Sequence, residues 1–123
     1  MIIGIGTDLA KVSRLESSLE RLGDRFAERI LAPIEMAEYR GHARPARLLA
    51  KRFAVKEAAA KALGTGIGKV SWHDIYIEHD EMGAPILCFQ GHARVLADQK
   101  AISHLHVSIS DEDDLALAFV VLS

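Results

Sequence analysis

The chain has 123 residues, half of them hydrophobic, and a formal net charge of −2 at pH 7. Its length suits a single domain over residues 1–123 with a modest core, and the lack of a basic excess argues against a dedicated nucleic-acid binder, which must neutralise phosphates. The single cysteine, Cys88, excludes an internal disulfide, and its apolar neighbours predict a small buried core residue.

The apolar content bears on membranes and on assembly. No apolar run approaches the ~18 residues that a membrane-spanning helix needs, and no signal-peptide pattern opens the sequence, so we expect a cytoplasmic protein without membrane contact. The mean hydropathy of +0.12 is high for so small a chain. We therefore expect part of the apolar surface to be covered in an oligomer.

In chain order, the sequence predicts helices and strands that are segregated rather than strictly alternating. The first half holds a strand over residues 2–8, helices over 13–22, 25–30 and 33–39, and a long helix that follows a break at 41–45 and stops at Gly64. The second half holds strands over 72–78 and 86–89, a helix over 93–100, and a hairpin of strands over 105–110 and 115–122 with a solvated acidic turn. This pattern indicates the α+β class, with a small antiparallel sheet packed with a long central helix.

The first strand is expected to break into a turn at Asp8, and strand ends commonly carry functional side chains. In the helix that follows, Ser13 is predicted as the N-cap and Glu16, three residues later, completes a capping box. Gly23 closes this helix. An aspartate at a strand end is otherwise a turn former or a cap, and the local pattern leaves that alternative open.

The long helix carries two ridges of residues spaced four apart. One ridge combines apolar and charged side chains: Leu49, Phe53, Glu57 and Lys61. The other consists of small side chains that let another element approach closely: Ala50, Ala54, Ala58 and Ala62. Because Phe53 marks the first ridge as inward-facing, Glu57 requires a partner, since burying an isolated charge is costly. Either Lys61, one turn later, neutralises Glu57 as a helix ion pair, or a metal does.

Asp8 and Glu57 together form a candidate site for a hard cation. Mg²⁺ typically binds one or two carboxylates and fills its remaining positions with water and substrate phosphates. Mn²⁺ suits the same oxygen ligands, so the residue types do not choose between the two metals. If the fold brings Asp8 and Glu57 together, the sequence predicts a site of this kind.

Two segments of the chain resemble a known family when they are taken together. Gly6-Thr7-Asp8 is followed, after 44 intervening residues, by the segment Phe53-Ala54-Val55-Lys56-Glu57-Ala58-Ala59-Ala60-Lys61. This pair resembles the two-part signature of the phosphopantetheinyl transferases, most closely that of their short bacterial type. The resemblance covers essentially the whole chain, as far as residues 106–108.

The resemblance implies an activity and an assembly. The activity is transfer of the 4′-phosphopantetheine group from coenzyme A to a serine of an apo-acyl carrier protein, with release of adenosine 3′,5′-bisphosphate, in support of fatty acid biosynthesis. The assembly is a homotrimer with active sites between adjacent subunits. Asp8 and Glu57 would hold Mg²⁺ against the pyrophosphate, and Glu57, directly or through a water, would accept the serine proton. Lys61 would contact the phosphate and stabilise the leaving group.

The same resemblance implies further residues at the coenzyme A site. The segment Gly64-Thr65-Gly66 by itself predicts a helix C-cap and turn, but the resemblance implies that it lines the coenzyme site with its backbone N–H groups near the pyrophosphate. His106, otherwise an ordinary strand histidine, is implied near the coenzyme phosphates. Arg52 is expected either to bind the 3′-phosphate or to extend a basic surface. Some members of the family carry a histidine where this chain has Asp111, so a role of that histidine is not assigned to this position.

Three arginines form a candidate docking surface for the carrier protein: Arg14, Arg21 and Arg25. Their spacings of seven and four put them on one face if the helical direction continues past Gly23. A neighbouring stripe is predicted to face the core: Leu15, Leu19 and Leu22. Such a pattern is ordinarily a solvated face, but a basic face on an acidic chain would attract a small acidic carrier protein.

A function of another class stays open. The chain could be a non-catalytic oligomeric module that binds coenzyme A or a nucleotide without transferring any group. Glu57 and Lys61 would then be a structural pair and Asp8 a turn residue. The presence of all three residues argues against this alternative, because a chain without transfer activity could lose them without unfolding.

Overall fold

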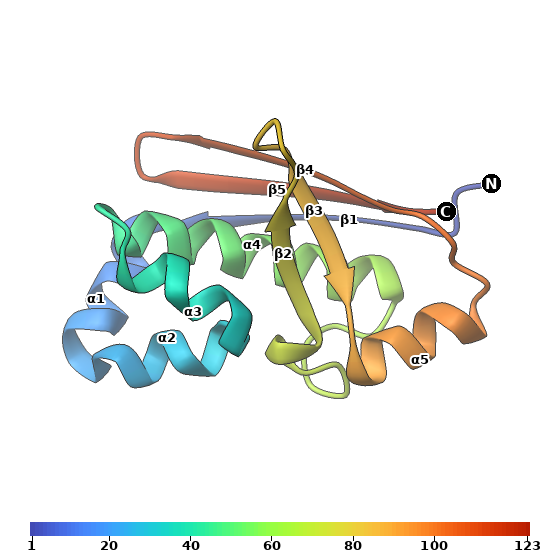
Figure 1. The fold of residues 1–123 in the computed structure, drawn as a ribbon, viewed down its shortest axis with the longest axis horizontal. Helices are drawn as coiled ribbons and strands as arrows, with labels where there is room; N and C mark the ends of the chain where they lie inside the picture. The colour runs from blue at the N-terminus through green and yellow to red at the C-terminus, as the bar shows by residue number, and fades with distance from the viewer.

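Helix α4 (Pro45–Leu63) lies against a three-stranded antiparallel sheet in the computed structural model, which describes all 123 residues (Figure 1). The strands of this sheet, in the spatial order β1-β5-β4, are β1 (Gly4–Lys11), β5 (Leu115–Leu122) and β4 (Leu105–Glu112). The other elements in chain order are α1 (Val12–Leu22), α2 (Asp24–Ile30), α3 (Pro33–Arg40), the 3-10 helix η1 (Trp72–Asp74), β2 (Ile75–His79), β3 (Pro85–Phe89) and α5 (Gly91–Gln99). The prediction of an α+β fold with a small antiparallel sheet on a long central helix is confirmed.

Strand β1 extends further than predicted, because β5 supplies hydrogen-bonding partners well beyond Asp8. The register pairs Asp8 with Ala118 and continues to Lys11, which lies opposite Leu115. The prediction that the strand breaks into a turn at Asp8 is therefore wrong. Asp8 lies within the strand and, like Gly4 and Gly6, on the face that packs against α4.

Strand β1 lies very close to α4 because both surfaces consist of small residues. A Cβ on Gly4 would collide with the carbonyl oxygen of Ala62, and a Cβ on Gly6 would collide with that of Ala58. The ridge of small residues predicted on α4 is buried along its whole length: Ala50, Ala54, Ala58 and Ala62. This close approach confirms the prediction for the ridge, and it fixes which residues of α4 lie beside Asp8.

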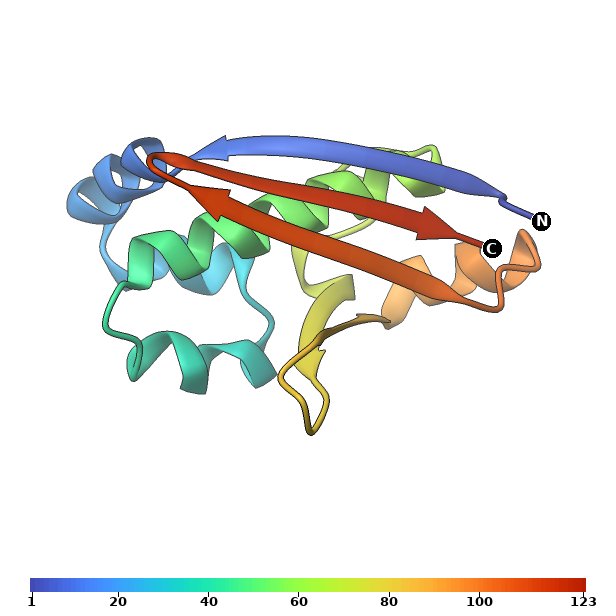
Figure 2. The same ribbon diagram turned by 90° about the horizontal axis from the view of Figure 1, so that it is seen from above.

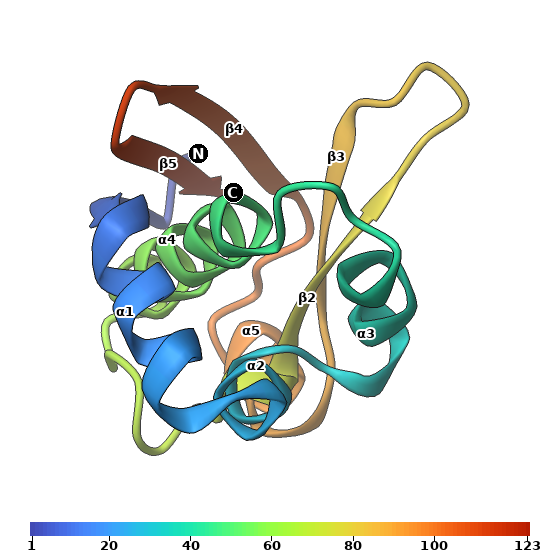
Figure 3. The same ribbon diagram turned by 90° about the vertical axis from the view of Figure 1, so that its left-hand side faces the viewer.

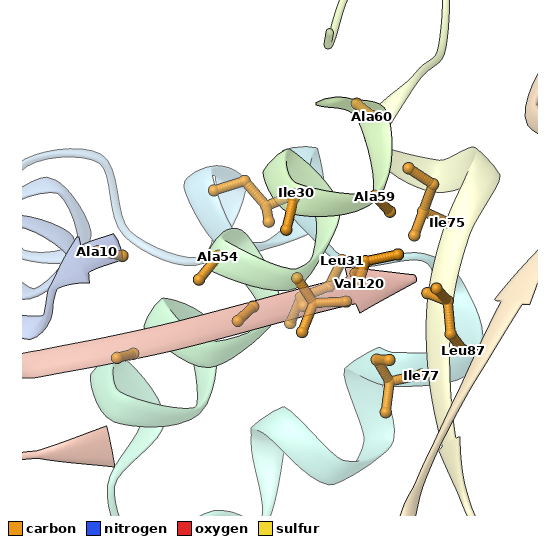
Figure 4. Close-up of a cluster of buried hydrophobic side chains, with 14 of the residues drawn as sticks. Ala10, Ile30, Leu31, Ala54, Ala59, Ala60, Ile75, Ile77, Leu87 and Val120 are labelled. Atoms are coloured by element: carbon orange, nitrogen blue, oxygen red, sulfur yellow. The ribbon is translucent and has the colours of Figure 1, made fainter. Parts of the chain in front are cut away.

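The buried hydrophobic side chains form one cluster around α4. Figure 4 shows side chains of this cluster that come from different elements: Ala59 of α4, Ile77 of β2, Leu87 of β3 and Val120 of β5. In β5 every second residue is buried, so one face of the sheet covers α4 and the other face is exposed. The exposed face bears on assembly and is described below.

The β2–β3 hairpin forms a separate two-stranded antiparallel sheet whose turn projects away from the rest of the chain (Figure 3). In β3, Leu87 and Phe89 point into the core, so Cys88 points to the other face and lies half-buried beside Glu78, with Sγ 4.0 Å from Oε2. The prediction that Cys88 is a buried core residue is therefore wrong. None of the helices has the length and apolar character required to span a membrane.

The start of α1 also differs from the prediction. The N-cap residue is Lys11, whose side chain makes no capping hydrogen bond, and Ser13 lies inside the first turn. The capping box of Ser13 and Glu16 is therefore wrong. Instead, the carboxylate of Asp114 in the β4–β5 turn accepts hydrogen bonds from the backbone N–H and the hydroxyl of Ser13, at 2.8 and 2.6 Å. The acidic turn is thus in contact with α1 and is not merely solvated.

Candidate functional site

Asp8 and Lys61 meet where β1 crosses the second half of α4. The Nζ of Lys61 donates hydrogen bonds to Asp8 Oδ1 at 2.9 Å and to the carbonyl oxygen of Thr7 at 3.1 Å. The Asp8 side chain is 17% exposed and that of Lys61 is 51% exposed, so the ion pair lies at the edge of the β1–α4 contact, open to solvent on one side. The hydroxyl of Thr7 donates to Ala118 on β5 at 3.0 Å, which holds this part of β1 to the sheet.

Glu57 lies one turn before Lys61 on α4 and is partly buried. Burial raises the pKa of Glu57 above its ordinary value, the negative charge of Asp8 raises it further, and the positive charge of Lys61 lowers it. No ion pair joins Glu57 to Lys61, whose ammonium group instead contacts Asp8. The helix ion pair that we considered for Glu57 and Lys61 is therefore wrong, and Glu57 keeps a free carboxylate near that of Asp8.

This arrangement fits a divalent cation. Burial is the main reason that the pKa of Glu57 is raised, and repulsion from Asp8 adds to it; a cation held by these carboxylates would offset both effects. No group of three or more acidic, histidine or cysteine side chains in the chain is arranged so that it could hold a metal ion. The residues therefore match a site of the Mg²⁺ type, in which the protein supplies one or two carboxylates and other ligands come from water and phosphate.

A second charged cluster, which sequence analysis missed, lies inside the protein on another face of α4. Lys56 is fully buried, and its Nζ donates to Glu35 Oε1 at 2.6 Å and to the carbonyl oxygens of Ile30 and Trp72 at 2.7 and 3.1 Å. Burial lowers the pKa of Lys56, against the opposing effect of Glu35. The cluster joins α4 to the end of α2, to α3 and to η1.

The carboxylate of Glu35 also binds backbone groups of neighbouring elements. Its two carboxylate oxygens accept hydrogen bonds from the N–H groups of Ala32 and Ile77, at 2.9 and 3.1 Å. Glu35 therefore satisfies Lys56 and two buried backbone donors at once. A signal for the cluster was present in the sequence, since Lys56 shares its helical face with the apolar residues Leu49, Ala60 and Leu63, and a charged residue on such a face requires a buried partner.

Arg52 belongs to the same interior side of α4. Its guanidinium pairs with Glu38 at 2.9 Å and lies 3.4 Å from Glu35, and its side chain is only 3% exposed. Arg52 and Lys61 are nine residues apart and lie on opposite sides of the helix. The structure therefore does not bring Arg52 to the Asp8–Lys61 pair, and both roles expected for Arg52, in phosphate binding and in a basic surface, conflict with its buried position.

The glycine-rich loop ends α4. Gly64 adopts the left-handed conformation, with φ of 85°, and its N–H group donates to the last turn of the helix. The N–H groups of Thr65 and Gly66 both donate to the carbonyl oxygen of Ala60 at 3.1 Å. These three N–H groups are already paired, which contradicts our expectation that they contact the pyrophosphate. A coenzyme contact through other atoms of this loop stays a prediction.

His106 is exposed on β4, on the face of the sheet that points away from α4. Its ring stacks against that of His104 at a centroid distance of 6.2 Å. Within one chain, therefore, His106 does not join Asp8, Glu57 and Lys61. Asp111, at the end of the same strand, forms ion pairs with Arg47 at 2.9 Å and with Lys51 at 3.8 Å.

The three arginines of the candidate docking surface are all exposed and form no ion pair: Arg14, Arg21 and Arg25. The condition for a shared face fails, because Gly23 has φ of 67° and α2 runs in a different direction from α1 (Figure 3). Arg25 therefore lies on another helix from Arg14 and Arg21. Leu22, predicted to face the core, is 44% exposed, so that part of the prediction is wrong.

The comparisons with known proteins agree with this geometry. A model of the 4′-phosphopantetheinyl transferase superfamily matches residues 4–120. The chain is 52% identical over 121 residues to the holo-[acyl-carrier-protein] synthase of Aliivibrio salmonicida, covering 98% of this chain and 96% of that protein. It is 50% identical over 123 residues to the synthase of the same name from a strain of Vibrio cholerae, covering 99% and 98%.

Solved structures show the same relationship. The holo-[acyl-carrier-protein] synthase of Neisseria meningitidis has a TM-score of 0.94 and 44% identity, over 100% of this chain and 99% of that one. The Helicobacter pylori synthase, solved in complex with coenzyme A, has a TM-score of 0.84 and 34% identity, over 97% and 99%. The chain belongs to the 4′-phosphopantetheinyl transferase superfamily. Its relatives over the whole length are holo-[acyl-carrier-protein] synthases, which confirms the resemblance seen in the sequence.

Proposed function

We propose that residues 1–123 act as one 4′-phosphopantetheinyl transferase domain that modifies an apo-acyl carrier protein with coenzyme A as donor. The observation that carries the proposal is the convergence of Asp8, Glu57 and Lys61 at the β1–α4 contact in a member of this superfamily. The names of the relatives support an acyl carrier protein as the substrate, and the complex of the Helicobacter pylori synthase with coenzyme A supports coenzyme A as the donor. A role in fatty acid biosynthesis and a cytoplasmic location stay predictions.

The reaction joins the serine oxygen of the carrier protein to the phosphorus of the phosphopantetheine group. The bond from that phosphorus to the bridging oxygen breaks, and adenosine 3′,5′-bisphosphate leaves with the bond electrons. Asp8 and Glu57 would hold Mg²⁺, which would supply positive charge to the pyrophosphate oxygens. Glu57, directly or through a water, would accept the proton of the serine hydroxyl, because its carboxylate forms no ion pair with Lys61, whose ammonium group contacts Asp8 instead. Lys61, held by Asp8 and Thr7, presents its ammonium group to the phosphate.

We also propose that the active protein is a homotrimer with the sites between subunits. The outer face of the sheet carries large apolar side chains of β1 and β5 that are 38–61% exposed in the single chain: Ile5, Leu9, Leu115, Leu117 and Phe119. Covering such a face by a second copy removes apolar area from water. A cleft of about 630 Å³ lies between α1 and the start of α4, and neither Asp8 nor Glu57 lines it. A site completed by a neighbouring subunit would account for the open position of these residues.

Intact-protein mass spectrometry tests the proposed reaction. An apo-acyl carrier protein is incubated with this chain, coenzyme A and Mg²⁺, with EDTA in the control. We expect the carrier to gain the mass of one phosphopantetheine group only in the presence of the metal. Coenzyme A binding without any mass gain, for several carriers, would instead favour the non-catalytic binding module. Size-exclusion chromatography with light scattering tests the assembly, and a stable monomer would contradict the trimer.

A further inference from the structure

One residue of the turn between β4 and β5, Asp114, forms hydrogen bonds to the beginning of α1. Asp114 accepts a hydrogen bond from Val12 N–H through its carbonyl oxygen at 2.8 Å. Its carboxylate accepts two more from Ser13, one from the N–H group at 2.8 Å and one from the hydroxyl at 2.6 Å. Because Lys11 provides no capping side chain, Asp114 supplies the acceptors that the first turn of α1 would otherwise lack.

The position of this contact gives it a consequence for α1. Strand β1 ends at Lys11 and α1 begins at Val12, so no loop separates them. The start of α1 is therefore joined directly to the strand that carries Asp8, and Asp114 holds this junction, while the rest of the helix packs against α4. Figure 2 shows the β4–β5 turn lying beside the start of α1. Arg14, in the first turn of α1, lies only one residue beyond Ser13.

The turn that carries Asp114 is itself tied to α4. Arg47 donates a hydrogen bond to Asp111 at 2.9 Å and another to the carbonyl oxygen of Asp113. Lys51 adds a longer ion pair with Asp111 at 3.8 Å. The contacts thus connect the helix that carries Glu57 and Lys61 to the turn, and the turn to α1.

We propose that Asp114 is a positioning residue for carrier-protein docking: by holding the first turn of α1 to a turn anchored on α4, it sets where Arg14 stands relative to Asp8 and Glu57. This inference rests on the proposed function, in which α1 binds the acidic carrier. Removal of the Asp114 carboxylate leaves α1 folded, since Val12 and Leu15 remain buried against the core. It releases the first turn, so Arg14 no longer meets the carrier in the orientation that brings the serine to Glu57. Coenzyme A contacts are not affected.

The test is steady-state kinetics of the full-length protein with Asp114→Ala. We expect the KM for apo-carrier protein to rise about tenfold, while the KM for coenzyme A and kcat at saturating carrier change less than about twofold. Asp114→Asn keeps an oxygen acceptor for the Ser13 N–H group and should recover most of the loss. Glu112→Ala is the matched control, because Glu112 is the last residue of β4, two positions before Asp114, and its exposed side chain carries the same charge but makes no hydrogen bond or ion pair. An equal rise in KM for Asp114→Ala and Glu112→Ala would show a general charge effect and overturn the proposal.

A double-variant cycle separates positioning from simple loss of structure. In an Arg14→Ala background, Asp114→Ala should raise the KM for carrier no further, because the residue it positions is gone. If Asp114→Ala raised the KM for carrier protein as much in the Arg14→Ala background as in the parent, the proposal would be contradicted. If Asp114→Ala fails to fold, Ser13→Ala is used in its place. This variant removes one hydrogen bond to Asp114 and should raise the KM for carrier protein about threefold. No rise in that KM would refute the inference. If Arg14→Ala alone leaves the KM unchanged, docking on α1 is wrong, whereas an effect of Arg14 without one of Asp114 rejects the positioning role alone.

Discussion

Replacement of Lys56 by methionine tests the interior cluster that joins α4 to its neighbours. The side chain of Lys56 is fully buried and donates to Glu35, Ile30 and Trp72 at distances between 2.6 and 3.1 Å. Methionine fills most of the space of the lysine stem but donates no hydrogen bond. The variant therefore leaves a buried carboxylate without its strongest partner and two carbonyl oxygens without a donor.

The expected loss is large. Removal of one partner of a buried ion pair typically costs about 3–5 kcal/mol. Glu35 keeps the N–H groups of Ala32 and Ile77, which places the loss toward the lower end of that range. For a chain of 123 residues, this corresponds to a fall in the melting temperature of about 10–20 °C.

Urea unfolding followed by tryptophan fluorescence measures this loss, because Trp72 is the only tryptophan and its carbonyl oxygen accepts from Lys56. Protein concentration is kept fixed, since an oligomer gains stability with concentration. Arg94→Ala is the control: its ion pair with Asp98 is exposed, and its loss should cost less than about 0.5 kcal/mol. Adding Glu35→Gln to Lys56→Met should recover part of the stability, because it removes a buried negative charge that keeps only the longer contact with Arg52, at 3.4 Å. A loss below about 1 kcal/mol for Lys56→Met would refute this account of the cluster.

Three further predictions address the site and its support. Gly6→Ala should destabilise the fold by about 1–3 kcal/mol and lower transferase activity, because the new Cβ meets the carbonyl oxygen of Ala58 and pushes β1 away from α4; urea unfolding and turnover measure both effects. Glu57→Gln should stabilise the fold at neutral pH: the raised pKa means that the ionised carboxylate opposes folding, and this penalty appears as pH rises from the unfolded pKa through the folded one. The difference in unfolding free energy between variant and parent should therefore vanish as pH falls toward about 4, and a constant difference would contradict it. Arg14→Glu should raise the KM for carrier protein far more than that for coenzyme A, and an equal effect on both would reject docking on α1.

The arrangement of β1 on α4 could be predicted because its determinants are local and periodic. Gly4 and Gly6 alternate on one face of a strand, and small residues recur every four positions on the helix. Both patterns favour close packing, and that packing brings Asp8 to Lys61. The pairing of Asp8 with Lys61, rather than of Glu57 with Lys61, could not be read from spacing, because it depends on how far β1 continues beside α4.

Other features depend on contacts between distant parts of the chain. Asp114 caps α1 from 101 positions away, so the local pattern at Ser13 and Glu16 gave a plausible but wrong cap. Glu35 reaches Lys56 across 21 positions, and nothing near either residue identifies its partner. Arg52 could not be assigned to the interior for the same reason, since Glu35 and Glu38 lie on a different helix.

The rate of holo-carrier formation tests the central claim most directly, that Asp8 and Glu57 act together in the transfer. Intact mass would be followed over time at saturating coenzyme A, carrier and Mg²⁺ for Asp8→Asn and Glu57→Gln, with the surface variant Asp98→Asn as control. We expect each of the first two variants to lose at least about a hundredfold in rate while remaining folded, because Asp8 would hold the metal and orients Lys61, and Glu57 would hold the metal and accept the serine proton. The control should keep the parent rate. A rate near that of the parent for either Asp8→Asn or Glu57→Gln would contradict the account.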